Sequence, residues 1–352
     1  MRKLFLFAVI AIFGLASCTD EQILDNPQTD GDGISFRTMV GKNPNFKAME
    51  LTNAAFQEFW VSAYRTSNDA PLTGLIGEIL VPYINNLRVF KTDVALNTWS
   101  YGAGTNYYWP GVQKLNFFAH NAGATSVMPT TTNANTDSPC PWFDFTQTST
   151  TLDQKDVVVA KNANEVYSLG RLPVALQFSH ALCQINFSLQ GAVPGPEFRI
   201  KKIRLIGANT VGKYTFLPDD VDPLVYVRRW SGQSTPQPIT YFENTASPTY
   251  ITNTLVSFGD GGVGNKAIMI IPQDGSNLSI EVTYDFANAG VILVADAVAT
   301  VSLSGQAMNA GKKVRYNLTI PVPSSITGNR IEFTGTVTDW TGEVLGSYTL
   351  AN

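Results

Sequence analysis

Side chains that perform acid–base or nucleophilic chemistry are sparse in this chain of 352 residues, which contains two histidines and three cysteines. We place His180 on the solvent face of a β-strand. Cys183 lies three positions further on, so it points to the opposite face of that strand, and the two residues form no dyad or metal pair there. No nucleophile–base pair stands out elsewhere. The sequence therefore predicts that the protein is not an enzyme and binds no metal and no cofactor, with Cys140 and Cys183 as free thiols.

Two short motifs resemble ligand sites but lack the context that such sites need. Residues 259–264 (GDGGVG) match the glycine pattern of dinucleotide-binding loops. That motif needs a following helix, whereas residues 267–272 read as a strand, so we interpret the motif as a glycine-rich hairpin loop. Asp219, Asp220 and Asp222 do not have the spacing of an EF-hand, and we interpret them as a solvated turn.

The composition excludes several classes of protein. Only 15% of the residues are charged, against roughly 25% in an average globular protein, and the net charge is −4. The 44% of apolar residues argues against intrinsic disorder. No basic excess is present to neutralise phosphates, so we expect no nucleic-acid partner.

The first residues form an export signal. Two cations at Arg2 and Lys3 precede an apolar run over 4–16, which is too short to span a bilayer because spanning needs roughly 20 residues. The run ends in Leu-Ala-Ser-Cys at 15–18, which resembles the lipobox of bacterial lipoproteins. The sequence predicts a signal peptide over 1–17, lipidation of Cys18 and a flexible tether over 18–33, with the lipid as the membrane anchor.

After the tether, apolar and polar residues alternate with the period of two that is typical of half-buried antiparallel strands. The clearest runs cover 181–189, 278–286 and 314–322. The apolar parity changes between Ile200 and Ile203, which indicates a β-bulge or a bend. Many short strands separated by turns predict an all-β protein built from antiparallel β-sandwich domains. We place the first domain at 34–166 and the second at 167–352.

Aromatic residues are dense between positions 99 and 109. Trp99 and Trp109 are candidates for stacking against a ligand such as a glycan. The alternative, which we favour, is that the cluster packs in the core and its loops.

Several segments along the mature chain resemble, in order, the fimbrillins (type V pilins), surface lipoproteins of anaerobic Gram-negative bacteria. The matching segments are 33–36, 59–64, 108–119, 155–160 with 174–182, and 311–320 with 337–340. The most specific part is the pair DVVVA and VALQFSHAL. The resemblance implies two transthyretin-like domains in a structural or adhesive subunit of cell-surface fimbriae. It also implies other fimbrial subunits as partners, with the outer membrane reached through the lipid anchor.

The resemblance also implies assembly by β-strand donation. In the family, a protease that cuts after Arg removes the N-terminal segment with its first strand, and a strand of a neighbouring subunit fills the emptied groove. At the corresponding place this chain has Phe46-Lys47-Ala48, and the nearest upstream arginine is Arg37, inside the expected first strand. Arg37 and Lys47 are therefore the candidate processing positions, and a processed chain would be located in the fimbrium.

A donor strand is available at the end of the chain. Residues 343–350 place four side chains on one face, namely Val344, Gly346, Tyr348 and Leu350. The same pattern fits the last strand of the chain's own domain, and both interpretations stay open. If the chain is not cut, it serves as an anchor or tip, or as a non-polymerising surface lipoprotein that binds glycans or host ligands.

Overall fold

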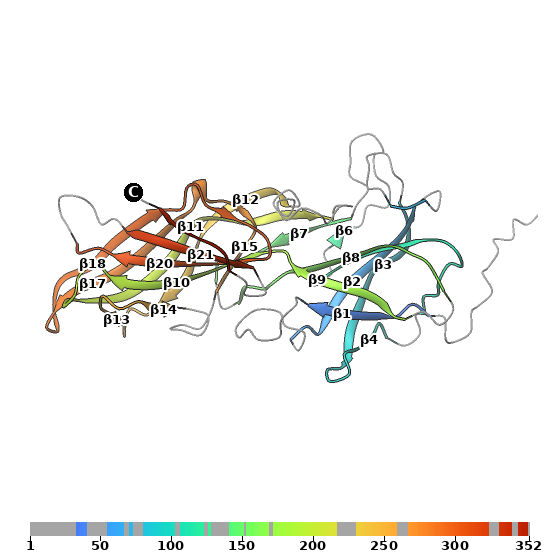
Figure 1. Cartoon of the computed structure of the whole chain (residues 1–352), viewed down its shortest axis with the longest axis horizontal. Helices are drawn as coiled ribbons and strands as arrows, with labels where there is room; N and C mark the ends of the chain where they lie inside the picture. The colour runs from blue at the N-terminus through green and yellow to red at the C-terminus, as the bar shows by residue number, and fades with distance from the viewer. Residues whose placement is uncertain are drawn as a thin grey trace, which may run out of the picture.

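The computed structural model shows an elongated molecule made of strands joined by turns and loops (Figure 1). The described residues are 33–40, 55–66, 70–72, 80–102, 106–122, 126–127, 141–150, 153–168, 172–216, 230–258, 267–323, 331–339 and 344–350. Within these ranges no α-helix occurs, and accordingly no helix has the length and apolarity to cross a membrane. The all-β fold class is confirmed.

The N-terminal half contains one seven-stranded sheet. Its order is β1 (Phe36–Val40), β9 (Val174–His180), β8 (Val158–Glu165), β5 (Leu115–His120), β2 (Glu58–Thr66), β3 (Leu80–Asp93) and β4 (Thr98–Ser100). All pairs are antiparallel except β1 with β9. In Figure 1, β2 and β3 run steeply across the direction of β1, β8 and β9. The sheet curls around one core, to which Phe59, Phe117 and Phe178 contribute.

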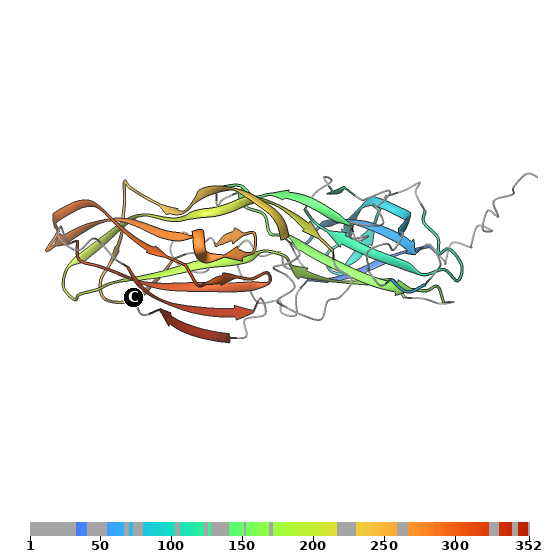
Figure 2. The ribbon, with the colours of Figure 1, turned by 90° about the horizontal axis from the view of Figure 1, so that it is seen from above.

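The C-terminal half is a sandwich of two sheets. The first contains β14 (Val256–Phe258), β10 (Cys183–Gly191), β20 (Lys312–Ile320), β21 (Glu332–Asp339) and β22 (Val344–Leu350), with β15 (Ile268–Ile270) also on β10. The second contains β18 (Val291–Ser302), β17 (Ser279–Asn288), β11 (Glu197–Thr215), β7 (Trp142–Thr146) and β6 (Ser126–Val127), with β12 (Trp230–Glu243) and β13 (Thr249–Ile251) also on β11. A small ribbon joins β16 (Gln273–Asp274) to β19 (Ala307–Met308). Figure 2 shows the red strands of the first sheet on one side and the yellow-green strands of the second on the other.

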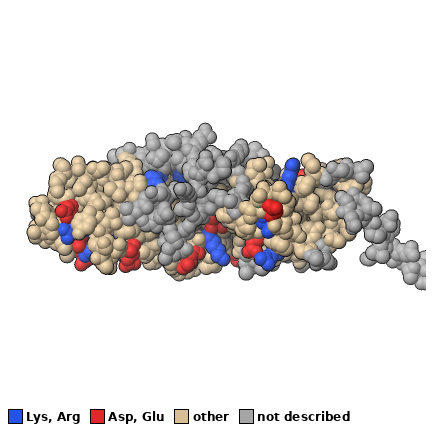
Figure 3. Space-filling view, turned by 90° about the horizontal axis from the view of Figure 1, so that it is seen from below, with Lys and Arg blue, Asp and Glu red and all other residues tan. Residues whose placement is uncertain are grey.

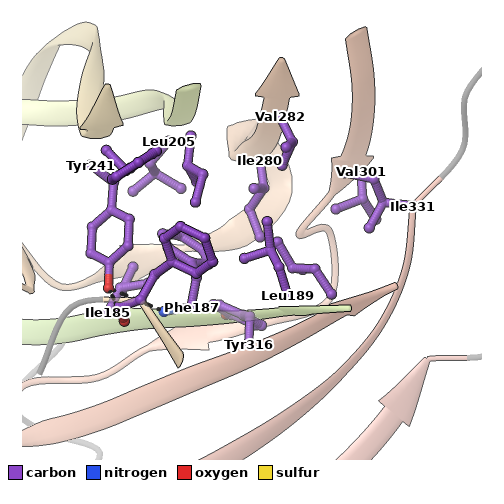
Figure 4. Close-up of a cluster of buried hydrophobic side chains, with 14 of the residues drawn as sticks. Ile185, Phe187, Leu189, Leu205, Tyr241, Ile280, Val282, Val301, Tyr316 and Ile331 are labelled. Atoms are coloured by element: carbon purple, nitrogen blue, oxygen red, sulfur yellow. Dashed lines mark hydrogen bonds between the residues drawn. The ribbon is translucent and has the colours of Figure 1, made fainter. Parts of the chain in front are cut away.

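The period-two pattern explains the sandwich core. Figure 4 shows Ile185, Phe187 and Tyr316 of the first sheet facing Leu205 and Ile280 of the second. Every apolar position predicted to face inward between 278 and 286 is buried. Each fully buried side chain of this size contributes roughly 1.5–3 kcal/mol, so these faces hold the two sheets together.

The predicted irregularity after Ile200 is confirmed. The pairing of β11 with β17 shifts register between Ile200 and Lys202, so one extra residue restores the inward direction of the next apolar side chain. β11 continues through this bulge and is 19 residues long. It pairs with β17 over Glu197–Ile206 and with β7 over Val211–Thr215.

Strand pairing does not follow the boundary that we placed between 166 and 167. β9 lies after that position, yet it pairs with β8 and β1 of the first half. β7 lies before it, yet it pairs with β11 of the second half. β9 ends at His180 and β10 begins at Cys183, so the chain passes from the first sheet to the second half at Ala181 and Leu182.

A third buried cluster lies where the two halves meet. It includes Phe118 and Val159 of the first sheet and Tyr214, Trp230 and Met269 of the second half. The Phe143 ring stacks on that of Tyr214 at 5.1 Å between centroids. The two halves share this core and are not joined by a bare linker.

Candidate functional site at the β1 edge

The first strand, β1, lies at the edge of the N-terminal sheet. It pairs with β9 in parallel, from Phe36 opposite Val174 to Val40 opposite Phe178. Its burial alternates, so that Phe36, Thr38 and Val40 point inward while Arg37 and Met39 point outward. β1 is therefore an edge strand with one face in the core and one face in solvent.

A few polar contacts hold the strand besides its pairing with β9. The Ile34 N–H donates to the Tyr107 carbonyl at 2.8 Å, and the Tyr101 hydroxyl donates to the Ile34 carbonyl at 2.9 Å. On the outer edge, the Asn97 side-chain amide donates to the Thr38 carbonyl at 3.0 Å. The partner residues of these contacts, Tyr107, Tyr101 and Asn97, lie in the segments before and after β4.

The inward side chains of this segment insert into the aromatic core. The Phe36 ring makes edge contacts with Phe59 at 5.9 Å, with Phe117 at 6.0 Å and with Tyr101 at 6.4 Å between centroids. Ile34, Phe36 and Val40 are all buried. At roughly 1.5–3 kcal/mol each, the three side chains contribute about 5–9 kcal/mol before ordering costs. Loss of this segment would expose both unpaired backbone of β9 and an apolar groove.

Cys18, predicted for anchoring, and Lys47, predicted for processing, lie outside the described residues. The predicted hairpin loop at 259–264 and the aspartates at 219–222 lie outside them as well. Arg37 is described, and its peptide bond to Thr38 lies inside the paired part of β1.

The C-terminal strand β22 forms the other edge that concerns assembly. It pairs with β21 in the antiparallel sense, with Gly346 opposite Val337 and Tyr348 opposite Gly335. Among the described strands, β21 is its only neighbour, at the end of the β14–β10–β20–β21–β22 sheet. In the single chain the segment thus pairs within its own sheet and lies at the end of that sheet.

The tryptophans predicted for ligand stacking take part in packing. Trp109 is 4% exposed and contacts Phe117 at 5.9 Å, so it presents no face to a ligand. Trp99 is partly buried and contacts Phe56 at 5.3 Å and Phe59 at 5.1 Å between centroids. The Lys91 ammonium lies 4.9 Å from the centre of the Trp99 ring, and burial lowers the pKa of Lys91. The packing interpretation of this aromatic cluster fits these contacts.

Both histidines are buried near the junction of the two halves. The His180 Nδ1 lies 2.7 Å from Asp156 Oδ2, and both side chains are almost fully buried. The prediction that His180 lies on a solvent face is therefore wrong, because His180 belongs to β9, where it shares the buried face with Leu176 and Phe178, and not to the strand that follows. The His120 ring stacks on Phe143 at 4.5 Å, and burial lowers the pKa of His120 to about 4, which keeps it neutral.

The polar network around this junction was missed from sequence. The Gln154 side-chain oxygen Oε1 accepts from the Met269 N–H at 2.8 Å, and the Trp230 indole donates to the Ala181 backbone carbonyl at 2.9 Å. Asp156 and His180 both occur in the DVVVA and VALQFSHAL segments, so pairing those two segments was the available signal.

In the part of the chain that the structure describes, no group of three or more His, Cys, Asp or Glu side chains converges on a metal-sized space. Cys183 is a free thiol, as predicted, and burial raises its pKa to about 12. Cys140 lies outside the described residues.

The molecule is an elongated all-β protein with a β-sandwich in its C-terminal half. The family model described as "Fimbrillin-like" matches residues 47–340, so the chain belongs to the fimbrillin-like family. The resemblance inferred from sequence is confirmed.

Two solved structures are similar to the chain at low sequence identity. A fimbrial protein from Bacteroides vulgatus is similar to the chain with a TM-score of 0.57 and 17% identity, covering 87% of this chain and 99% of that one. A proposed cell adhesion protein from Bacteroides ovatus matches with a TM-score of 0.49 and 14% identity, over 88% of this chain and 97% of the other. None of the curated proteins matches the chain.

Proposed function

We propose that the chain is a structural or adhesive subunit of cell-surface fimbriae and that its copies assemble by β-strand donation. Membership of the fimbrillin-like family supports the fimbrial role, a cell-surface location and other fimbrial subunits as partners. The observation that carries strand donation is the edge strand β1, which buries Phe36 in an aromatic core while Arg37 faces solvent. A donor strand would satisfy the backbone of β9 and the apolar groove together.

The spacing of the C-terminal strand matches the groove. Inward positions of the β1 segment are 34, 36, 38 and 40, and the candidate donor residues are 344, 346, 348 and 350. Aligned in reverse, Leu350 replaces Ile34, Tyr348 replaces Phe36, Gly346 replaces Thr38 and Val344 replaces Val40. This alignment places the aromatic ring of Tyr348 at the position of the Phe36 ring, and Gly346 at the position of the small residue Thr38. We infer that the donor strand runs opposite to β1, which makes it antiparallel to β9.

Processing decides whether the groove opens. A cut after Lys47 would separate the whole of β1 from the folded part, whereas a cut after Arg37 would leave Thr38, Met39 and Val40 attached. The bond after Arg37 also lies within a paired strand, where a protease cannot bind it in the extended form without first detaching the strand. We therefore propose Lys47 as the productive position, with Cys18 anchoring the uncut chain to the outer membrane.

The test uses a variant in which residues 44–47 are replaced by a site-specific protease sequence. After cutting, we expect a synthetic peptide of residues 343–352 to bind and to raise the unfolding temperature. The same peptide with Tyr348→Asp should not bind, because a carboxylate would be buried in the aromatic pocket. Failure of the unmodified peptide to bind a cut chain that has lost β1 would contradict strand donation.

The alternative is a non-polymerising surface lipoprotein that binds glycans or host ligands. The burial of Trp109 and the lysine over Trp99 leave this alternative without an exposed aromatic platform among the candidate residues. A glycan array probed with the intact chain tests it, and specific binding lost on Trp99→Ala would favour it.

A further inference from the structure

The edge strand β18 carries an apolar surface that the fold leaves exposed. Val291, Ile292, Leu293 and Val294 are consecutive and exposed, with Val291 at 64% and Leu293 at 58%. They lie on both faces of the strand, next to the turn of the β17–β18 hairpin at the end of the molecule far from β1 (Figure 1). Burial of such side chains is worth roughly 1.5–3 kcal/mol each, so water is an unfavourable neighbour for them.

The backbone pairing of β18 is one-sided in the described part of the chain. Among the described strands, β17 is the only one paired with β18. The Ile331 N–H donates to the Thr300 carbonyl, which covers the far end of β18 but not its first residues. The hairpin turn at Ala289 and Gly290 has positive φ values of 49° and 82°, which keeps the two strands tightly paired up to the tip. The open edge therefore belongs to a fixed strand.

Natural sheets protect open edges with charges, prolines or very short strands. The edge strand β12 follows this rule, since it contains Pro236 and Pro238. Residues 286–295 at the β18 tip contain neither a charge nor a proline. On the face drawn in Figure 3, charged side chains form a few small mixed groups separated by uncharged surface.

The one charged residue of β18, Asp296, forms an ion pair within the chain. The Lys201 ammonium lies 2.7 Å from Asp285 and 2.8 Å from Asp296, so one cation serves two carboxylates and the group keeps a net charge of −1. The Asp296 N–H also donates to the Asp285 carboxylate at 2.9 Å. Both carboxylates are therefore paired with Lys201.

We propose that the β18 tip is a contact surface for a second copy of this chain, with the two β18 strands antiparallel about a two-fold axis at Leu293. In that register Leu293 faces Leu293 of the second copy and Ile292 faces Val294, so the segment is complementary to itself. Asp296 then lies opposite Gly290, and no like charges meet. The contact is a side-to-side association that does not depend on strand donation.

The geometry limits the strength of this contact. The β17–β18 register shifts at Leu293 and again before Ala297, and such bulges bend an edge strand away from a long straight pairing. The contact is confined to the tip, with on the order of a few hundred Å² per copy. Stable complexes bury about 800 Å² per partner, so isolated copies associate weakly and reversibly. Copies aligned on a common surface or fibre would associate more firmly, because their effective concentration is higher.

Sedimentation velocity on the mature chain without its lipid tests this proposal, over about 1 μM to about 1 mM. We expect a reversible monomer–dimer equilibrium that Leu293→Asp weakens by at least about tenfold. A mixture of Leu293→Asp and Leu293→Lys should restore association, because the two side chains meet across the axis. The control is Val112→Asp, which replaces a residue that is 89% exposed in the other half and should change nothing.

Three results would overturn the proposal. One is a chain that stays monomeric across the whole range. The second is a Leu293→Asp variant that, with the unfolding temperature of the parent, dimerises as the parent does. The third is a monomeric chain that floats with neutral phosphatidylcholine vesicles through the same four residues, because the surface would then bind lipid.

Discussion

The Nδ1 atom of His180 lies 2.7 Å from a carboxylate oxygen of Asp156, inside the core shared by the two halves of the molecule. Asp156 precedes β8 and His180 ends β9, so this bond fixes the point where the chain leaves the first sheet. Breaking a buried pair leaves one polar group without compensation, which costs about 3–5 kcal/mol.

We therefore expect Asp156→Ala to lower the free energy of unfolding by about 3–5 kcal/mol in urea denaturation. The matched control is Glu58→Ala, which breaks the solvent-exposed pair with Arg88. Exposed pairs contribute about 0–1 kcal/mol, so this control should change stability little. Equal effects of the two variants would show that the junction pair does not stabilise the fold.

The inward face of β1 gives a second prediction. Phe36→Ala should lower the free energy of unfolding by about 3–5 kcal/mol, because it leaves a cavity among the rings of Phe59, Phe117 and Tyr101. Arg37→Ala, one position along the same strand but facing solvent, should change it by less than about 0.5 kcal/mol. A fully stable Phe36→Ala protein would mean that β1 is not held by its core contacts.

His120 makes stability depend on pH. Burial lowers its pKa from 6.5 to about 4, so between these values the unfolded chain binds a proton that the folded chain does not. Stability therefore falls as the pH drops from about 6.5 to about 4, by on the order of 3 kcal/mol from this residue. The difference between the parent and His120→Gln, measured by urea denaturation at pH 7 and pH 4, isolates this contribution from the carboxylates. A constant difference across that range would contradict the prediction.

Cys183 should be unreactive while the protein is folded. It is fully buried in β10, and the raised pKa of about 12 leaves almost no thiolate at neutral pH. In a Cys140→Ser background of the mature chain without its lipidated residue, a thiol reagent should modify Cys183 only in denaturant. Rapid labelling of the folded protein would show that β10 opens locally.

Sequence alternation was enough to predict the strands whose two faces differ most. β10, β17 and β20 overlap the runs chosen for their period of two, with ends displaced by one or two residues, and the bulge in β11 follows from the parity change near Ile200. These features are local, because the direction of each side chain follows from that of its neighbours along the same strand.

Features that depend on distant segments were not predicted. The parallel pairing of β1 with β9 and the pairing of β7 with β11 join segments far apart in the chain, and alternation does not encode a partner. We assigned His180 to the strand that follows it, whereas the fold places it at the end of β9, on the same face as Phe178. Trp109 and Trp99 belong to the same aromatic run in the sequence, and only the fold shows that Trp109 is buried while Trp99 is partly buried.

The long strand β11 determines how the molecule responds to a pulling force. It runs along the long axis and pairs with β17 near one end and with β7 near the other (Figure 1). Tension along that axis therefore loads its hydrogen bonds in shear, so that many bonds must break together and not one after another. Resistance to such tension is a matter of unfolding rate more than of equilibrium stability. A surface filament exposed to flow would benefit from a subunit that yields slowly in this direction.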